Sequence, residues 1–488
     1  MSLMNFVDFE TSGKFIEADK LLKTNMYDYG IDVVSDRALP DYRDGLKPAQ
    51  RRLFWTANDL KARFDCKSVK SARITGDCMG KYHPHGDAYG SLVSLATNEY
   101  PVILGQGNWG SLTDAPASSR YTECKISEIG MSLLECNAVT DFIPNYTGEF
   151  LEPIVINSRL PYYFINECSG IAVGLSVNIP PHNLGEVVDA LKVVVKKGDK
   201  TKVDDIFKFL KAPDYRHGGY ILSTEDEIKK VYKNGNGTIK YSCDYTLTKQ
   251  KKNYLLTVTG YCLGFNPNNF MKRMDALIDT GEVIYVNDSS TKDEPYKLEV
   301  MVRSKEDFEN VIKKHLEKSE SYRYYAVERR KSEVENKDIE IEIISTNVID
   351  LMNRWVEWRR DVETKMCLKE KDVLIDKRWK LEMRLLSSNS LKTIIKSLES
   401  EDTIGYLLNN LKGLEKFKNP RECARFICNQ RIIELKKTDQ EKVKKEIDVL
   451  NKEIDKIDKD IKNIDSVVIR ELNKLKRFSN KRKVGISW

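Results

Sequence analysis

The feature that most constrains this chain is an apolar repeat near its C-terminal end. Aliphatic residues recur there in alternating steps of four and three, and they are Val443, Ile447, Leu450, Ile454, Ile457, Ile461 and Ile464. This spacing places their side chains along one seam of a helix, with Lys, Glu and Asp on both sides of it. The repeat therefore predicts a long helix that needs a partner along its seam.

A second helical pattern, at about residues 347–386, offers that partner. Its larger apolar side chains are Trp355, Trp358, Val362, Met366 and Leu374. We expect the two helices to pair as an antiparallel coiled coil, with the residues between them forming a helical cap. The alternative is one amphipathic helix packed on a globular core, but such a helix needs a wider apolar stripe. The charges on both flanks of the seam favour the coiled coil.

The chain has 488 residues, which is too many for one hydrophobic core and indicates about three domains. We expect an α+β multidomain protein that begins with a helical arm over 1–30 and a mixed domain over 31–165. A domain richer in strands would follow over 166–345, because short β-prone runs alternate there with turn signals such as Asn234-Gly-Asn-Gly. The coiled coil and its cap would fill 346–488.

Composition narrows the class of protein. Hydrophobic residues make up 41% and charged residues 32%, as in a globular chain with much solvated surface, and the net charge of +6 does not by itself indicate nucleic acid. The ten cysteines form no CxxC pair, which favours free thiols over a zinc site. Because we find no secretory signal and no apolar run approaching about 18 residues, we expect a cytoplasmic protein.

A glycine pattern at Gly105, Gly107 and Gly110 has the spacing of a dinucleotide-binding loop. Such a loop must open into a helix whose first amides face the pyrophosphate. Pro116 would lie inside that helix, where it lacks an N–H group and clashes with the preceding turn. We therefore reject a nucleotide-binding oxidoreductase and interpret the glycines as a tight loop whose backbone passes close to something.

Two segments of the mixed domain suggest phosphate binding. The first surrounds a helix start at Pro48 and holds the cations Arg37, Lys47, Arg51 and Arg52. The second is a turn stiffened by Pro84 that carries His83 and His85. Each alone has an ordinary interpretation, as a solvated basic surface or as a turn with two satisfied histidines. A metal pair is disfavoured because we see no third ligand.

A third segment joins Arg120 to Tyr121. A phenol is a poor nucleophile unaided, but a neighbouring guanidinium stabilises both the phenolate and the charge that develops on a phosphate under attack. A phosphotyrosyl ester would also conserve the energy of a broken phosphodiester for resealing. An Arg–Tyr dipeptide alone is background, so the argument depends on the combination of segments.

That combination resembles a known family. RALPDYRDGLKPAQRR, YHPHGD, GQGNWGS, ASSRYTE and SGIAVGLSVNIPPHNLGEV stand in the order found in the breakage–reunion subunits of type IIA DNA topoisomerases. These include the A subunits of bacterial gyrase and topoisomerase IV and the DNA-cleaving subunits of tailed phages. The resemblance is close over about 25–183 and looser beyond, and the chain looks most like a stand-alone phage-type subunit without a C-terminal DNA-wrapping domain.

The resemblance implies a role for each matching residue. Tyr121 would be the nucleophile that forms a 5′-phosphotyrosyl link, and Arg120 would stabilise the transition state. The residues implied to contact the cleaved duplex are Arg37, Lys47, Arg51, Arg52, His83, His85 and Ile171. Among these, Ile171 would be wedged between base pairs to bend the DNA, a known use of an apolar side chain. Without the resemblance, Ile171 would pass for an ordinary core isoleucine.

The resemblance also implies an architecture and partners. A winged-helix cleavage domain, an α/β tower, and a long coiled coil ending in a helical C-terminal dimer gate would follow one another, with a gate helix at about 430–435. The protein would be a homodimer through the cleavage domain and this gate. Because the chain shows neither an ATPase signature nor an acidic TOPRIM cluster, Mg²⁺ and ATP are expected to bind a separate gyrase B-like subunit. Relaxation and decatenation are expected rather than supercoiling.

Two departures from the bacterial pattern bear on the expectations. The segment from Asp87 to Ser91 is about two residues shorter than in bacterial gyrase, so quinolone sensitivity does not carry over. Trp109 stands where bacterial relatives usually have Phe.

The alternative function is a non-catalytic architectural DNA-binding protein with a coiled-coil dimer interface, which would have no need of Arg120 and Tyr121.

Overall fold

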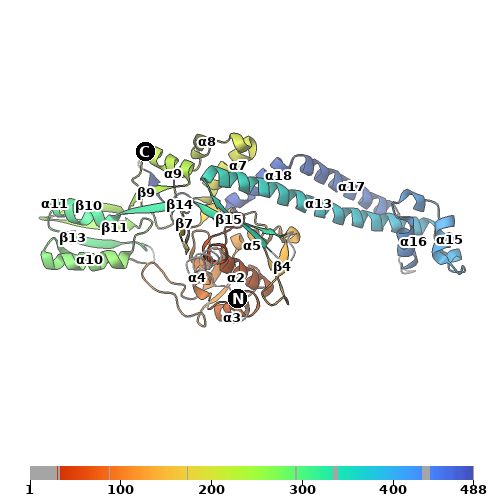
Figure 1. Ribbon diagram of the computed structural model, residues 1–488, viewed down its shortest axis with the longest axis horizontal. Helices are drawn as coiled ribbons and strands as arrows, with labels where there is room; N and C mark the ends of the chain where they lie inside the picture. The colour runs from red at the N-terminus through yellow and green to blue at the C-terminus, as the bar shows by residue number, and fades with distance from the viewer. Residues whose placement is uncertain are drawn as a thin grey trace, which may run out of the picture. The chain divides into compact units, whose positions relative to one another are not determined.

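The computed structural model describes residues 30, 33–86, 88–172, 174–291, 294–332, 339–430, 440–486 and 488. Nearly all of the arm predicted over 1–30 therefore lies outside the described residues, as does Asp87. The chain divides into two compact units, Met1–Arg359 with Val468–Trp488 and Arg360–Val467 (Figure 1). It is a mixed α/β protein, whereas the domain boundaries predicted from the sequence stay a prediction.

Three helices and a small antiparallel sheet form the first part of the larger unit. The helices are α2 (Pro48–Asp59), α3 (Ser71–Lys81) and α4 (Tyr89–Thr97), and the sheet order is β1 (Val69–Lys70), β3 (Glu123–Ile126) and β2 (Ile103–Gln106). Helix α2 begins as the sequence predicts, with Pro48 in its first turn and Lys47 as its N-cap. Its buried face, with Leu53, Phe54 and Ala57, packs in the main core.

A six-stranded sheet forms the centre of the larger unit. Its order is β17 (Gly485–Ile486), β8 (Tyr220–Ile221), β9 (Asn236–Ser242), β14 (Glu317–Arg323), β7 (Leu175–Ile179) and β6 (Cys168–Ala172). Strands β6 and β7 form an antiparallel hairpin in which Ile171 pairs with Ser176. Strand β17 pairs in parallel with β8, so residues near the end of the chain complete a sheet that begins with β6, far back in the sequence.

A four-stranded antiparallel sheet lies next along the chain. Its order is β10 (Asp244–Gln250), β11 (Asn253–Gly260), β13 (Leu298–Val302) and β12 (Val283–Asp288), and α10 (Pro267–Thr280) runs along it (Figure 1). The β-prone runs of the sequence that begin at residues 219, 237, 254 and 283 lie in β8, β9, β11 and β12. In β11, alternating side chains such as Leu256 and Val258 are buried, as expected for a strand with one face on the core.

Shorter elements complete the larger unit. Its remaining helices are α5 (Glu128–Leu134), α6 (Tyr162–Ile165), α7 (Leu184–Lys197), α8 (Val203–Phe207), α9 (Glu225–Asn234), α11 (Lys305–Asp307) and α12 (Lys313–Leu316), with a π-helix η1 (Val34–Ala38). Two hairpins join β4 (Phe142–Pro144) to β5 (Leu151–Pro153) and β15 (Tyr325–Lys331) to β16 (Ile339–Ser345). None of the described helices has the length and hydropathy needed to cross a membrane.

The smaller unit is built on two long helices. They are α13 (Val348–Asn389), which starts in the larger unit, and α17 (Gln440–Lys462), which is followed by α18 (Ile464–Leu475). Ion pairs join Arg360 to Asp465 and Lys371 to Asp458, so the two helices run antiparallel (Figure 1). Heptad residues Val443, Ile447 and Leu450 pack with Leu374, Leu381 and Leu385. The repeat therefore packs against the second helical stretch, whereas a coiled coil stays a prediction.

The residues between these helices also fold as helices. They are α14 (Leu391–Ser397), α15 (Thr403–Asn410) and α16 (Pro420–Cys428), and a small core of their own includes Met383, Leu407 and Cys423. A helical segment between the long helices was the expectation. The gate helix expected at about 430–435 lies outside the described residues except for its first position, Gln430.

Candidate functional site

Arg120 and Tyr121 stand on an exposed turn that leads into β3. The Tyr121 N–H donates to the carbonyl of Ser118 at 2.9 Å, which closes the turn. The Tyr121 side chain is 68% exposed, an unusual state for a large aromatic group. The Arg120 guanidinium carbon lies 5.1 Å from the centre of the Tyr121 ring. The Tyr121 phenol and the Arg120 guanidinium are therefore both exposed to solvent, next to each other.

The turn rests on a buried support. Thr122 is fully buried, and its hydroxyl donates to Ser71 Oγ at 2.8 Å and lies 2.9 Å from the Tyr89 hydroxyl. Main-chain N–H groups at the start of α3 donate to the same segment, from Ser71 to the Thr122 carbonyl at 3.0 Å and from Ala72 to the Ser119 carbonyl at 3.1 Å. The exposed tyrosine is thus fixed by the residue that follows it. We did not predict a role for Thr122, Ser71 or Tyr89, although Thr122 falls within the quoted ASSRYTE motif.

The glycine loop before this turn contains no helix in its described residues. The loop instead connects β2 to β3, which form an antiparallel pair. A side chain at Gly105 would meet the indole of Trp109, and Gly107 has a φ of +102°, which favours glycine. A Cβ at Gly107 would lie 3.4 Å from the Tyr121 carbonyl oxygen. The loop therefore passes close to the turn that carries Tyr121, as the sequence predicts, and is no nucleotide-binding loop.

The paired histidines lie just after α3. Their rings are 5.1 Å apart and nearly perpendicular. His83 is buried and His85 is exposed, and the His83 Nδ1 atom has no hydrogen-bond partner among the described residues. Burial, with the nearby Arg52, His85 and Arg37, lowers the pKa of His83 to about 4. His83 is therefore neutral near pH 7, and its unpartnered Nδ1 atom is buried.

The four predicted cations differ in their surroundings. Arg37 is exposed at the end of η1. Lys47 is half-buried and its ammonium donates to the carbonyl of Ser169 at the base of the β6–β7 hairpin. Arg52 forms a two-pronged pair with Glu152, with N–O distances of 2.7 and 2.9 Å.

Arg51 faces inward. Its guanidinium contacts both carboxylate oxygens of Asp44 at 2.6 and 2.8 Å and donates to the Leu46 carbonyl at 2.9 Å. Both Arg51 and Asp44 are buried. A phosphate could reach Arg51 only if this pair were broken, so the geometry gives Arg51 a structural task, and its contact with DNA stays a prediction.

Ile171 is the most exposed large apolar side chain of the described residues, at 85%. It lies near the tip of the β6–β7 hairpin, opposite Ser176. Exposing an isoleucine side chain to water on a hairpin costs free energy, which is recovered when a binding partner buries the side chain. Gly170 holds the hairpin against η1, because a Cβ there would meet the carbonyl of Ala38. The interpretation of Ile171 as a core residue is therefore wrong.

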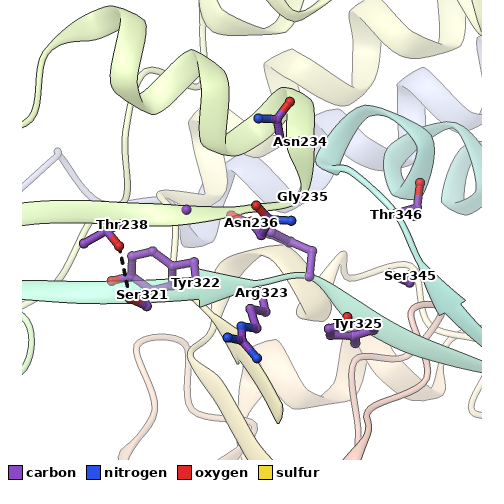
Figure 2. Close-up of a pocket in the computed structure, with 12 residues that line it drawn as sticks. Asn234, Gly235, Asn236, Thr238, Ser321, Tyr322, Arg323, Tyr325, Ser345 and Thr346 are labelled. Carbon is purple, nitrogen blue, oxygen red and sulfur yellow. Dashed lines mark hydrogen bonds between the residues drawn. The ribbon is translucent and has the colours of Figure 1, made fainter. Parts of the chain in front are cut away.

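Register places a row of polar side chains on the same face of the six-stranded sheet as Ile171. Asn178 of β7 pairs with Arg323 of β14, which pairs with Asn236 of β9. The Arg323 guanidinium donates to Ser176 Oγ at 3.3 Å, directly across the hairpin from Ile171. Figure 2 shows Arg323 on β14, beside a polar pocket of about 450 Å³ that Asn236 and Thr238 also line. Arg323 was not predicted, since only strand pairing brings it to the hairpin.

The structure thus brings the predicted residues together in groups. Arg37, Arg52 and His85 act electrostatically on His83. Lys47 bonds to the hairpin that carries Ile171. Tyr121 and Arg120 lie at the other end of α3 from His83, a helix whose 11 residues span about 16 Å.

Comparisons with known proteins identify the family of the chain. A family model that describes the A subunits of DNA gyrase and topoisomerase IV matches residues 37–473. The A subunit of DNA topoisomerase 4 from Haemophilus influenzae is 29% identical over 435 residues, which cover 86% of this chain and 56% of that protein. The A subunit of DNA gyrase from Dehalogenimonas lykanthroporepellens is 30% identical over 449 residues, covering 88% and 53%.

A third relative is more similar over a shorter stretch. The A subunit of DNA gyrase from Thermotoga maritima is 44% identical over 229 residues, which cover 45% of this chain and 28% of that protein. The chain spans a little over half of the length of the first two relatives. The match to the family model covers most of the chain and confirms the resemblance drawn from the five motifs. The chain belongs to the family of DNA gyrase and topoisomerase IV A subunits.

Proposed function

We propose that this chain is the DNA-cleaving and religating subunit of an ATP-dependent type II topoisomerase. The observation that carries the proposal is Tyr121, an exposed phenol beside a guanidinium on a turn with a buried, hydrogen-bonded support. A turn of this kind can hold a nucleophile in a fixed place while leaving it open to a macromolecular substrate. Family membership supports the same activity.

The proposed reaction is a reversible transesterification. Tyr121 Oη attacks the phosphorus of a phosphodiester, forms a 5′-phosphotyrosyl bond, and loses its proton. The bond from phosphorus to O3′ breaks, and that oxygen takes up a proton to become a 3′-hydroxyl. Arg120 stabilises the negative charge on the five-coordinate phosphorus. Resealing is the reverse reaction, and no external energy is needed because one ester replaces another.

Gripping and bending the duplex is the proposed role of the remaining residues. Arg37 and Lys47 would contact phosphates, with Arg52 and Arg51 limited by their carboxylate partners. The neutral His83 and the exposed His85 lie at the opposite end of α3 from Tyr121, so they would lie beside the scissile phosphate that Tyr121 of a second copy attacks. Ile171 would enter a base step from its hairpin, where its exposure suits such a wedge.

The proposed architecture follows the family. The helices α2–α4 with the β1–β3–β2 sheet would be a winged-helix cleavage domain, and the two larger sheets a tower. The pair α13 and α17 would be a coiled coil that leads to a dimer gate. Two copies of the chain would meet at the cleavage domain and at the gate, and would act in the cytoplasm to relax and decatenate DNA.

Mg²⁺ and ATP are proposed to act through a separate gyrase B-like subunit. Within the part of the chain that the structure describes, no group of three or more His, Cys, Asp or Glu side chains is arranged to hold a metal. The steps above therefore use only this chain's own residues. A metal supplied by the partner protein would polarise the scissile phosphate.

The test is the replacement Tyr121→Phe. The variant, mixed with a gyrase B-like subunit, Mg²⁺ and supercoiled DNA, should form no covalent protein–DNA adduct after denaturation, while duplex binding stays within about twofold, a change of ~0.4 kcal/mol. Tyr285→Phe is the matched control, since Tyr285 is also an exposed tyrosine but lies on β12. Adducts formed by Tyr121→Phe at the level of the control would refute the proposal.

An architectural DNA-binding protein is the second candidate, because the exposed Ile171 by itself suits bending without cleavage. This candidate predicts that the unaltered chain bends a duplex but never forms an adduct, whatever partner protein and metal are supplied. The same adduct assay, run on the unaltered chain, separates the two functions.

A further inference from the structure

A second cavity, of about 710 Å³, lies beside the loop that leads to Tyr121. The end of α4 and residues 109–116 form one side of it. The other side comes from segments of the strand-rich part, and its lining residues include Tyr215, Arg216, His217, Tyr261, Asp288 and Tyr296. The two sides touch where Asn268 Nδ2 donates to the Thr113 carbonyl at 2.8 Å. This volume is typical of sites that bind small molecules, which range over about 300–1,000 Å³.

Aromatic rings form much of the wall. The His217 ring lies 4.7 Å from that of Tyr215 and 4.8 Å from that of Tyr296, in both cases edge to face. Tyr261 continues the cluster, with its ring 5.2 Å from Tyr296. Trp109 lines the opposite side. Aromatic faces of this kind attract apolar groups and cations.

Four carboxyl groups line the cavity, and they are Glu99, Asp114, Glu167 and Asp288. Burial raises the pKa of Glu99 to about 7 and also raises the pKa of Glu167, so a cation would meet negative charge mainly at the exposed Asp114 and Asp288. Arg216 is the one full positive charge of the described lining, and its guanidinium is already occupied by the carbonyls of Thr97 at 2.5 Å and Asn98 at 3.3 Å. Burial, with Arg216 nearby, lowers the pKa of His217 to about 4, so the imidazole is uncharged near pH 7. A cation is therefore favoured in this cavity and an anion is not.

One buried hydrogen-bond donor in the wall, on His217, has no acceptor among the described residues. His217 is only 8% exposed, and its Nε2 atom accepts a hydrogen bond from Arg216 Nε at 3.2 Å. The ring proton then lies on Nδ1, which has no partner among the described residues. Buried donors are almost always satisfied in native proteins. Because Nδ1 is itself buried, an acceptor atom on a ligand would satisfy it once the ring had turned toward the cavity.

We propose that the cavity binds a small organic cation: a protonated amine on an aromatic body that also carries a hydrogen-bond acceptor. The ammonium would lie beside the carboxylate of Asp288, and the aromatic body would lie against Tyr215 and Tyr296. The acceptor would receive the Nδ1 proton of His217. The site goes beyond the proposed DNA-cleaving function, because none of the residues proposed to touch DNA lines it.

The probe is 4-methoxybenzylamine, which has the amine, the ring and an ether acceptor, compared with the uncharged 4-methoxybenzyl alcohol. Binding to the full chain without DNA is measured by saturation-transfer NMR at pH 7. We expect the amine to bind at least about tenfold more tightly than the alcohol, in line with cation–π attraction joined to a carboxylate. Equal affinity for the two compounds, or no detectable binding of the amine, would overturn the proposal.

Two variants and a control locate the binding. Tyr296→Ala should weaken the amine about tenfold by removing a ring face. Asp288→Asn should weaken it while keeping the local structure, since Asp288 is exposed and an amide oxygen can still accept from the Ser290 N–H at 2.9 Å. Tyr285→Ala removes an exposed tyrosine of the same strand as Asp288 that does not line the cavity, and should change nothing. If Asp288→Asn bound the amine as the control does, the site would be refuted.

This experiment is independent of the proposed function. It uses neither DNA nor a partner protein, so loss of adduct formation would leave the cavity proposal intact. Failure of the amine to bind would likewise say nothing about Tyr121. A binding amine could then be added to the adduct assay, where an effect on cleavage would report on residues 109–116, which precede Arg120 and Tyr121.

Discussion

At the scale of the residue, the most exposed aromatic group of the candidate site depends on its most buried neighbour. Thr122 bonds at once to Ser71 and Tyr89, and the three hydroxyls form a connected chain under the turn. No charge holds these hydroxyls together, so their arrangement depends on hydrogen-bond geometry alone. Small changes there should therefore affect the placement of Tyr121 more than the folding of the protein.

Thr122→Val tests this dependence. It keeps the shape but leaves the hydroxyls of Ser71 and Tyr89 with one partner fewer, at a cost of about 1–3 kcal/mol. We expect a lower melting temperature, unchanged DNA affinity, and adduct formation slowed at least about tenfold, or ~1.4 kcal/mol. Thr364→Val is the control, because Thr364 Oγ1 bonds within its own helix, to the Arg360 carbonyl at 2.7 Å. An adduct rate equal to that of the control would show that Thr122 does not position Tyr121.

A buried histidine makes a second prediction at this scale. His182 bonds to the Phe164 carbonyl and the Tyr232 hydroxyl, each at 2.9 Å, and burial lowers its pKa to about 4. The unfolded chain binds the proton near pH 6.5, so the free energy of unfolding falls as pH drops from about 6.5 to about 4. In urea titrations between pH 7.5 and 5, His182→Gln should show a shallower pH dependence. A slope equal to that of the unaltered chain would contradict this.

At the scale of the element, the β6–β7 hairpin has attachments on both sides. Lys47 holds its base through the Ser169 carbonyl, and Arg323 reaches Ser176 from β14. Both attachments use cations, so a phosphate that approaches either one competes with the hairpin for the same charge. If the proposed contacts with DNA form, the hairpin would shift in response to the duplex as well as present Ile171.

Replacing Ile171 at the tip, and separately Arg323 at the attachment, should distinguish the wedge from the support of the hairpin. Ile171→Ala should reduce the bend of a duplex, measured by energy transfer between end labels, with affinity lowered less than about tenfold, or ~1.4 kcal/mol. Ile284→Ala is the control, since Ile284 is an exposed isoleucine on β12. A bend that is unchanged in Ile171→Ala would remove the wedge from the proposal.

Arg323→Ala tests the attachment. The loss of its bond to Ser176 should broaden the distribution of bend angles in the same energy-transfer assay, because the hairpin is held on one side only. It should also lower the salt dependence of duplex binding by about one unit of slope if Arg323 neutralises a phosphate. Arg330→Ala is the control, since Arg330 is an exposed arginine that pairs with Glu328 on the separate β15–β16 hairpin. Bending and salt slope equal to those of the control would restrict Arg323 to sheet structure.

At the scale of the whole molecule, the end of the chain completes the larger unit. Arg482 forms a two-pronged pair with Glu186 at 2.8 and 2.7 Å, and Asp214 accepts the N–H groups of Lys483 and Val484 at 2.9 Å. Deleting residues 477–488 would leave the half-buried Glu186 without its guanidinium partner and the buried Asp214 with the Asn183 amide alone, and each lost hydrogen bond to a charged group costs about 1.5–3 kcal/mol. We expect a melting temperature several degrees lower and faster hydrogen exchange in β8. Exchange that is unchanged in β8 would contradict the prediction.

Sequence reasoning succeeded for features that depend on a local pattern. It failed for side chains whose position depends on a tertiary partner. The heptad repeat, the helix start at Pro48 and the exclusion of a nucleotide loop by Pro116 all follow from spacing within one segment. Arg51 and Ile171 are different, since nothing nearby says that one meets Asp44 inside the core and the other faces solvent. Arg323 reaches the hairpin only because β14 pairs with β7, a strand far away in the sequence.

The boundaries between the two units fall inside helices rather than in loops. The chain leaves the larger unit within α13, at Arg359, and returns to it within α18, at Val468. Both crossings between the units are therefore made of main chain whose N–H and C=O groups are bonded within a helix, with no loop at either crossing.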